Sequence, residues 1–211
     1  MNTDSVRGAR LIGAAFGLSA LAHAPALVRT DPINVDEAYI AIMGRMQHAG
    51  GELFRTLVDR KPPIMLWAYR MLVPASWSLW PVHAAMVVLV AVHGVVIVAI
   101  ARRLGAQHST ALLAGALAIL GTAMFGPPDA QASNFELWGM LPASLAVLCA
   151  LRAGEARAHR FVGWMLAAGS CVGISTNTKQ PYVFTLAVVV AALPRTRRLV
   201  GCADRKSTRL N

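Results

Sequence analysis

The stretch D-P-I-N-V-D-E-A-Y-I-A-I-M-G-R-M-Q-H-A-G-G-E-L-F-R-T-L-V-D-R-K-P-P, residues 31–63, is the most polar interval between Arg10 and Arg195. It holds five of the ten acidic residues of the chain, and long apolar runs lie before and after it. A polar segment between membrane-spanning runs is stable if it lies outside the bilayer. The pattern therefore predicts a loop that lies outside the membrane, in a protein whose other segments cross it.

The composition of the whole chain supports a membrane protein. Of its 211 residues, 56% are hydrophobic and 14% are charged, and the mean hydropathy is +0.52. Soluble domains carry about 25% charged residues. The net charge is +10, but the arginines cluster at the ends of apolar runs. Membrane topology and anionic lipid headgroups explain that basic excess better than nucleic acid does, so membrane lipids are expected partners and nucleic acid is not.

A transmembrane helix needs about 20 apolar residues. Runs of roughly this kind occupy residues 11–28, 82–101, 109–125, 137–151, 161–176 and 181–194, the last of them marginal in length. These runs predict an all-α fold, a polytopic transmembrane helical bundle with about six spans. The first run is expected to be an uncleaved signal anchor that follows a cytoplasmic N-terminus, residues 1–10.

The distribution of Arg and Lys predicts the orientation. The short turns on the side away from the N-terminus carry only Lys179, and the long loop at residues 29–80 carries six basic residues that five acids offset. The connections on the N-terminal side carry Arg7, Arg10, Arg102, Arg103, Arg152, Arg157, Arg160, Arg195, Arg197 and Arg198. Basic residues favour the cytoplasmic side, so the loop at residues 29–80 is expected on the extracytoplasmic side of a bacterial-type inner or plasma membrane. Residues 204–211 are polar and lack periodicity, and we interpret them as a non-native or disordered tail of an incomplete chain.

Two helices are expected within the first loop. A helix over residues 36–49 would end at Gly50-Gly51, and a second helix would begin after Lys61 with Pro62 or Pro63 in its first turn. The apolar face predicted for the first helix consists of Tyr39, Ile40, Met43 and Met46. The aromatic residues of the second segment, which suit a position at the membrane interface, are Trp67, Tyr69, Trp77 and Trp80.

Four short motifs stand at the expected outer ends of the spans. They are Asp36-Glu37-Ala38-Tyr39, Asp59-Arg60-Lys61-Pro62-Pro63, Ala132-Ser133-Asn134-Phe135-Glu136 and Thr178-Lys179-Gln180-Pro181. In this order the chain resembles the GT-C superfamily of membrane glycosyltransferases, in its protein-O-mannosyltransferase and aminoarabinose-transferase-like branch (family 39, RgtA/B/C/D-like). The resemblance covers about residues 8–195, which would be the N-terminal part of a family member, and the expected glycosyltransferase domain is residues 11–203.

The resemblance implies inverting transfer of a sugar from a polyprenyl-phosphate donor to a lipid, glycan or protein acceptor outside the cell. Asp36 would be the catalytic base, and Glu37 would orient a substrate or bind metal. The residues that would contact the donor phosphate or the acceptor are Arg60, Lys61, Asn134, Glu136 and Lys179. In the aminoarabinose-transferase branch a Glu often precedes the Lys of the Lys-Pro-Pro motif, whereas here Arg60 does. A divalent metal ion therefore stays an open alternative, no metal ligand is assigned, and no other cofactor is predicted.

Simpler roles stand beside these functional ones. Asp36 and Glu37 suit the positive end of a helix dipole, and Asn134 and Glu136 suit a helix cap. Basic residues at the ends of spans commonly extend to the interface. His83 and His93 have no acidic residue nearby in the sequence, so both are expected to be packed histidines. The alternative functions are a transporter or flippase of a lipid-linked sugar and an inactive truncated fragment.

Overall fold

The computed structural model describes residues 3–52, 55, 63–73, 78–124 and 131–192. These residues form helices joined by turns and short irregular segments, and no strand occurs among them. The expected all-α class is confirmed. The helices outside the first loop are α1 (Thr3–Ala22), α2 (Ala24–Leu27), α5 (Trp80–Arg103), α6 (His108–Ala123), α8 (Phe135–Glu155), α9 (Ala158–Thr178), the 3-10 helix η1 (Gln180–Phe184) and α10 (Thr185–Ala192).

The described part of each of the six apolar runs is largely helical, but the helices differ in their suitability to cross a membrane. Among the described residues, α5 and α8 are long and apolar enough to span a bilayer by length and composition. Helix α6 and the segment Gln180–Ala192 are apolar but shorter. The first run is divided, because α1 ends at Ala22 and α2 begins at Ala24. The described residues thus contain two candidate spans, and the structure does not support the six spans that the sequence predicts.

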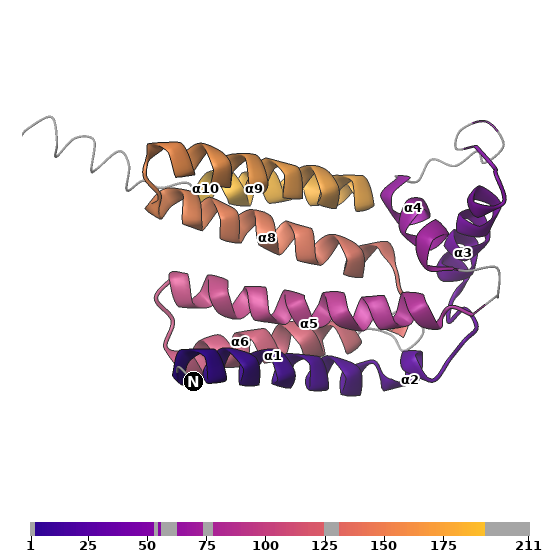
Figure 1. The fold of residues 1–211 in the computed structure, drawn as a ribbon, viewed down its shortest axis with the longest axis horizontal. Coiled ribbons are helices and arrows are strands. Elements are labelled where there is room, and N and C mark those ends of the chain that lie inside the picture. The colour runs from indigo at the N-terminus through magenta and orange to yellow at the C-terminus, as the bar shows by residue number, and fades with distance from the viewer. Residues whose placement is uncertain (1–2, 53–54, 56–62, 74–77, 125–130, 193–211) are drawn as a thin grey trace, which may run out of the picture.

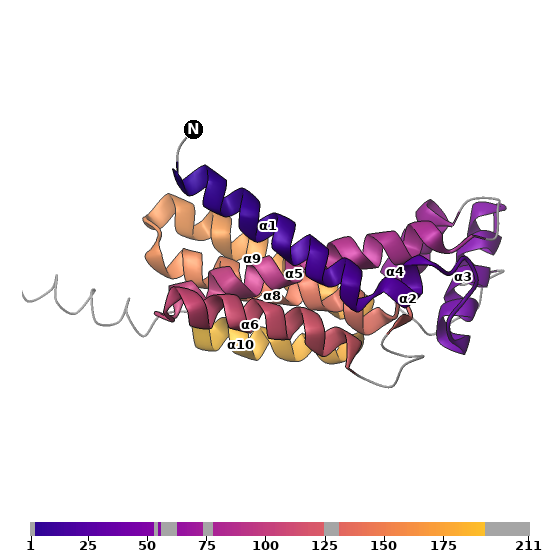
Figure 2. The same cartoon turned by 90° about the horizontal axis from the view of Figure 1, so that it is seen from below.

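Helix α5 is the central element of the bundle. It packs against α1 and α6 on one side and against α8 on the other, while α9 and α10 pack on α8 (Figures 1 and 2). The contact between α5 and α6 is close because both helices present glycine there. A Cβ atom added to Gly115 would lie 2.8 Å from the carbonyl oxygen of Gly94. Small residues at such a crossing let two helix backbones approach, as in many membrane helix pairs.

The polar first loop forms two helices at one end of the bundle, α3 (Val35–His48) and α4 (Pro63–Leu72) (Figure 1). The side chain of Asn34 caps α3 by accepting a hydrogen bond from the Glu37 N–H at 2.9 Å. The chain leaves α3 through Gly50, whose φ of +97° favours glycine. The expectations that α3 ends before Gly50-Gly51 and that α4 begins at a proline are confirmed.

The face that α3 buries differs from the expected one. Ile40 and Met43 are buried, but Tyr39 is 36% and Met46 46% exposed. The other buried residues of α3 are Glu37, Ala41, Gly44 and Gln47. The reason is the approach of α4, since a Cβ on Gly44 would lie 2.8 Å from the Cβ of Tyr69. A helix that packs so closely turns its small residues, not its largest apolar ones, toward its partner.

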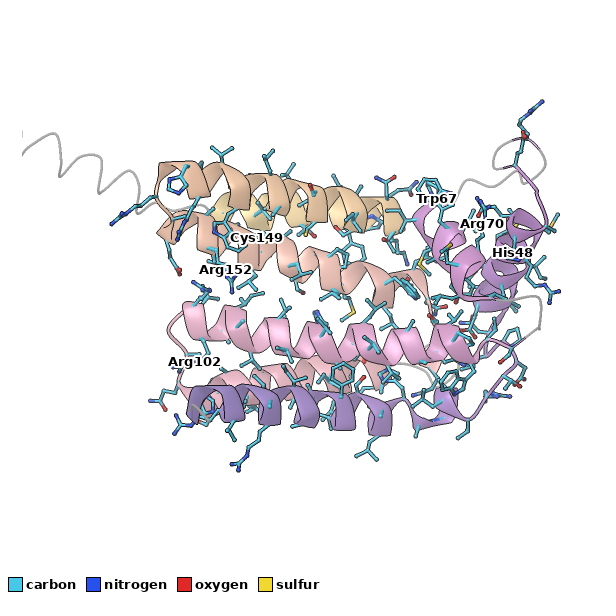
Figure 3. The ribbon with its side chains drawn as sticks, viewed as in Figure 1. His48, Trp67, Arg70, Arg102, Cys149 and Arg152 are labelled. Carbon is cyan, nitrogen blue, oxygen red and sulfur yellow. The ribbon has the colours of Figure 1, made fainter. Side chains whose placement is uncertain are left out.

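The aromatic residues of the first loop do not share one environment. Trp67 and Trp80 are half exposed, as residues at an interface would be, and Trp67 is labelled in Figure 3. Tyr69, in contrast, is fully buried in the cluster that joins α3 and α4 to the start of α5 and α8. Its ring fills the space between α3 and the bundle, so Tyr69 is a core residue, and the position of this segment at a membrane interface stays a prediction. Trp77 lies outside the described residues.

Candidate functional site

A cavity of about 810 Å³ is lined by residues of α3, α5, α6 and α8. Three of the residues singled out from the sequence line it, namely Asp36, Asn134 and Glu136. Its other described lining residues are mainly apolar: Leu117, Ala118, Gly121, Met124, Leu137 and Met140, with His93 and Thr122. The cavity therefore combines two carboxylate side chains with walls that an apolar chain could contact.

Asn134 and Glu136 occupy the beginning of α8. Asn134 is the N-cap residue, but its side chain does not make the capping hydrogen bond to α8. Glu136 lies in the first turn, where a carboxylate also suits the helix dipole. The capping interpretation thus holds for the charge of Glu136 and fails for the side chain of Asn134.

Lys179 comes to the same place from a distant part of the sequence. It follows α9, and its ammonium group forms an ion pair with the Glu136 carboxylate. The next turn of the chain is fixed to the same residue, since the Tyr182 hydroxyl donates to the Glu136 carbonyl oxygen at 2.7 Å. Asp36, Asn134, Glu136 and Lys179 are therefore brought together at or beside one cavity.

Glu37 faces the opposite way from its neighbour Asp36. Asp36 is exposed and lines the cavity, whereas Glu37 is fully buried and is not among the described lining residues. One Glu37 oxygen accepts from the Ile33 N–H at 2.7 Å, and the other accepts from the Ser133 N–H at 2.8 Å. Its carboxylate thereby links the beginning of α3 to the segment before α8.

His83 completes the surroundings of Glu37. Its Nε2 atom lies 3.0 Å from the same Glu37 oxygen that accepts from Ser133, and its Nδ1 atom lies 3.2 Å from the Arg29 carbonyl oxygen. Both ring nitrogens thus face oxygen acceptors, an arrangement that a doubly protonated imidazole satisfies. The expectation that His83 lacks an acidic partner is wrong, because the fold brings together residues 46 positions apart. His93 instead contacts the Ser144 hydroxyl at 3.0 Å.

Tyr69 and Ser133 extend this buried group, which we call the Glu37 cluster (Glu37, His83, Tyr69 and Ser133). The Tyr69 hydroxyl donates to the Ser133 carbonyl oxygen at 2.8 Å. Burial raises the pKa of Tyr69 well above its ordinary value, the negative charge of Glu37 adds to the rise, and the side chain of Ser133 opposes it. Ser133 stands within a motif recognised in the sequence, but no local pattern identifies His83 or Tyr69 as its companions.

Two of the expected site residues cannot be placed. Arg60 and Lys61 lie outside the described residues. Within the described part of the chain, no three His, Cys, Asp or Glu side chains come together as ligands for a metal ion. Cys149 and Cys171 are free thiols.

The chain was compared with known families, curated proteins and solved structures. No protein-family model matches it, and neither a curated protein nor a solved structure matches it either.

Proposed function

We propose that the chain is an integral membrane glycosyltransferase that transfers a sugar from a polyprenyl-phosphate donor to an acceptor on the extracytoplasmic face. The observation that carries this proposal is the cavity of about 810 Å³, where the Asp36 carboxylate lies with Asn134 and Glu136 against apolar walls. A lipid-linked sugar has the same two-part character, a polar head on an apolar chain.

In the proposed reaction, Asp36 acts as the general base. Its carboxylate accepts the proton of an acceptor hydroxyl as that oxygen forms a bond to the anomeric carbon of the sugar. The bond from the anomeric carbon to the phosphate oxygen breaks at the same time, and the electron pair leaves with the polyprenyl phosphate. Direct displacement inverts the anomeric centre. Such a base contributes typically about 10²–10⁴-fold to the rate.

The leaving phosphate needs positive charge. Lys179 pairs with Glu136, which lines the cavity, and we propose that Lys179 shares this task with Lys61 or Arg60. A cation placed where charge develops stabilises the transition state more than the ground state. Glu37 takes a positioning role in this scheme, because its buried hydrogen bonds fix the first turn of α3 and hence the direction of Asp36.

The described helices also argue against a transporter of lipid-linked sugar. Transporters place ionisable groups near the middle of the membrane. In α5, α6, α8, α9 and α10, every Asp, Glu, Lys and Arg lies near a helix end, and His93 is the one histidine of these helices that lies near the middle of a helix. Ionisable groups at the ends of apolar helices favour chemistry at the membrane surface.

The test uses membranes from cells that express the chain, supplied with radiolabelled undecaprenyl-phosphate-linked hexose or pentose. We expect release of undecaprenyl phosphate together with transfer of label to an acceptor. Asp36→Asn should reduce both about 10²–10⁴-fold at an unchanged amount of protein. The matched control is Asp31→Asn, an exposed acid five positions earlier that pairs with Arg29 at 3.6 Å, and it should keep full activity.

Two results would count against the proposal. Full activity of Asp36→Asn would remove Asp36 from the mechanism. Movement of the intact donor across sealed vesicles, with no cleavage of the sugar–phosphate bond, would instead assign the cavity to transport.

A further inference from the structure

A second cavity, of about 470 Å³, is lined where α5 and α8 end and α9 begins. Its lining includes four arginines from three segments of the chain: Arg103, Arg152, Arg157 and Arg160. Figure 3 shows Arg152 at the end of the bundle that lies away from α3 and α4. This cavity, here called the arginine pocket, is thus separate from the candidate site.

The charge of the arginine pocket is strongly positive. Glu155 is the one carboxylate among its described lining residues, and it pairs with Arg103. His159 also lines the pocket. The remaining three guanidinium groups have no acidic partner in the described lining. Repulsion among them is relieved most directly by an anion.

Arg152 is held in place in a way that leaves its hydrogen-bonding edge available. Its guanidinium group stacks over the Trp164 ring, with 4.9 Å from Cζ to the ring centre. Stacking uses the face of the guanidinium and not its N–H groups. The Nε atom of Arg152 is shielded from solvent and has no hydrogen-bond partner among the described residues. A buried donor without an acceptor is costly, and a phosphate oxygen would satisfy it.

The beginning of α9 adds further donors. Arg157 is the N-cap residue of α9, and its side chain makes no capping bond. The first backbone N–H groups of a helix lack partners within the helix and carry partial positive charge. These donors stand beside Arg157 and Arg160, both of which line the pocket. Planar guanidinium groups and a helix N-terminus together suit a tetrahedral phosphate oxyanion.

We propose that the arginine pocket binds the phosphodiester headgroup of an anionic phospholipid, on the side of the membrane opposite the candidate site. The pocket lies at the ends of two helices that are long and apolar enough to cross a bilayer. A headgroup there would have its acyl chains beside apolar helix surface. Basic pockets between membrane helices on the cytoplasmic side bind anionic headgroups in this way. The inference is independent of the proposed sugar transfer.

The test is native mass spectrometry of the purified full chain in detergent, titrated with phosphatidylglycerol, with phosphatidylcholine and with inorganic phosphate. We expect one phosphatidylglycerol to bind in preference to phosphatidylcholine. Arg152→Gln should weaken that binding about tenfold or more, the effect of losing one hydrogen bond to a charged group. The double variant Arg157→Gln, Arg160→Gln, with both positions exposed, tests the pocket without disturbing the packing on Trp164.

The control is the double variant Arg7→Gln, Arg10→Gln. It removes two positive charges, as Arg157→Gln, Arg160→Gln does, but from exposed positions on α1 that are not among the described lining residues of the pocket. It should reduce the affinity less than the double variant Arg157→Gln, Arg160→Gln does, because Arg7 and Arg10 would act only through general attraction to the anionic lipid and not through hydrogen bonds to its headgroup. An equal loss in this control, or equal binding of the two lipids, would overturn the proposal. Arginine-dependent binding of inorganic phosphate with no lipid retained would overturn the assignment to a lipid.

Discussion

Replacement of Glu37 by alanine should destabilise the protein strongly, because Glu37 is the fully buried acid among the described residues. The carboxylate is fully buried and accepts from the Ile33 N–H, the Ser133 N–H and His83. Glu37→Ala leaves all three donors without that acceptor. Each unsatisfied buried donor costs about 1–3 kcal/mol, and removal of one partner of a buried ion pair costs about 3–5 kcal/mol. We therefore expect a loss of about 3–5 kcal/mol.

The loss can be measured as a shift in thermal stability. For a chain of this length, about 1 kcal/mol corresponds to about 2–4 °C, so Glu37→Ala should lower the apparent melting temperature by about 6–20 °C. The assay heats the purified protein in detergent and follows the monodisperse fraction by size-exclusion chromatography. Glu52→Ala is the matched control, because Glu52 forms an exposed pair with Arg55 at 2.7 Å. Exposed pairs contribute about 0–1 kcal/mol.

The double variant Glu37→Ala, His83→Ala separates the pair from its surroundings. Its cost should be smaller than the sum of the two single costs, since each single variant leaves the other partner buried and alone. If Glu37→Ala melts within about 2 °C of the wild type, close to the shift that the Glu52→Ala control allows, the Glu37 cluster does not hold the first loop on the bundle and the reasoning above is refuted.

Two further predictions concern the contacts of Tyr69. Gly44→Val should lower the free energy of unfolding by about 1–3 kcal/mol through overpacking, because a Cβ there would lie 2.8 Å from the Tyr69 Cβ. Gly17→Val is the control, since nothing lies within 4 Å of a Cβ added at Gly17. Equal melting temperatures of the two variants would contradict the close contact. The pKa of Tyr69 is raised in the folded protein. The contribution of the neutral Tyr69 side chain to the free energy of unfolding is therefore fully present below about pH 10, and it is lost as the pH rises through the folded pKa. Urea denaturation of wild type and Tyr69→Phe between pH 8 and 11 should therefore show a steeper alkaline decline in the wild type, and parallel declines would disagree with this account.

The positions of the helices could be predicted from the sequence because the signals are local. The described part of each apolar run is largely helical, although the first and the last runs each form two helices. Pro63 begins α4, and α3 ends before Gly50-Gly51. The division at His23 was not anticipated. There the ring contacts the Ser19 carbonyl oxygen and the Thr122 hydroxyl, at 3.1 and 3.3 Å, and the second of these contacts depends on the packing of a distant helix.

The candidate site was only partly predictable for the same reason. Asp36, Asn134, Glu136 and Lys179 were singled out as motifs near the ends of helices, and a bundle brings such ends together. The companions of Glu37 could not be found in this way. His83 stands in an apolar helix with no acidic residue near it in the sequence, and its partner depends on how α3 is turned. That turn follows from Gly44 and Tyr69, a contact between residues 25 positions apart.

The span of the Glu37 contacts has a consequence for the order in which the protein is made. Glu37 accepts a hydrogen bond from the N–H of Ser133, a residue 96 positions later in the chain. At about 5–20 residues per second, on the order of 5–20 s of synthesis separates the two. Throughout that interval the carboxylate has its local partners but not the segment before α8. The first loop therefore reaches its final place on the bundle only after α5 and α6 have been made, and a ribosome that stalls before codon 133 would present Glu37 to water or to a chaperone instead.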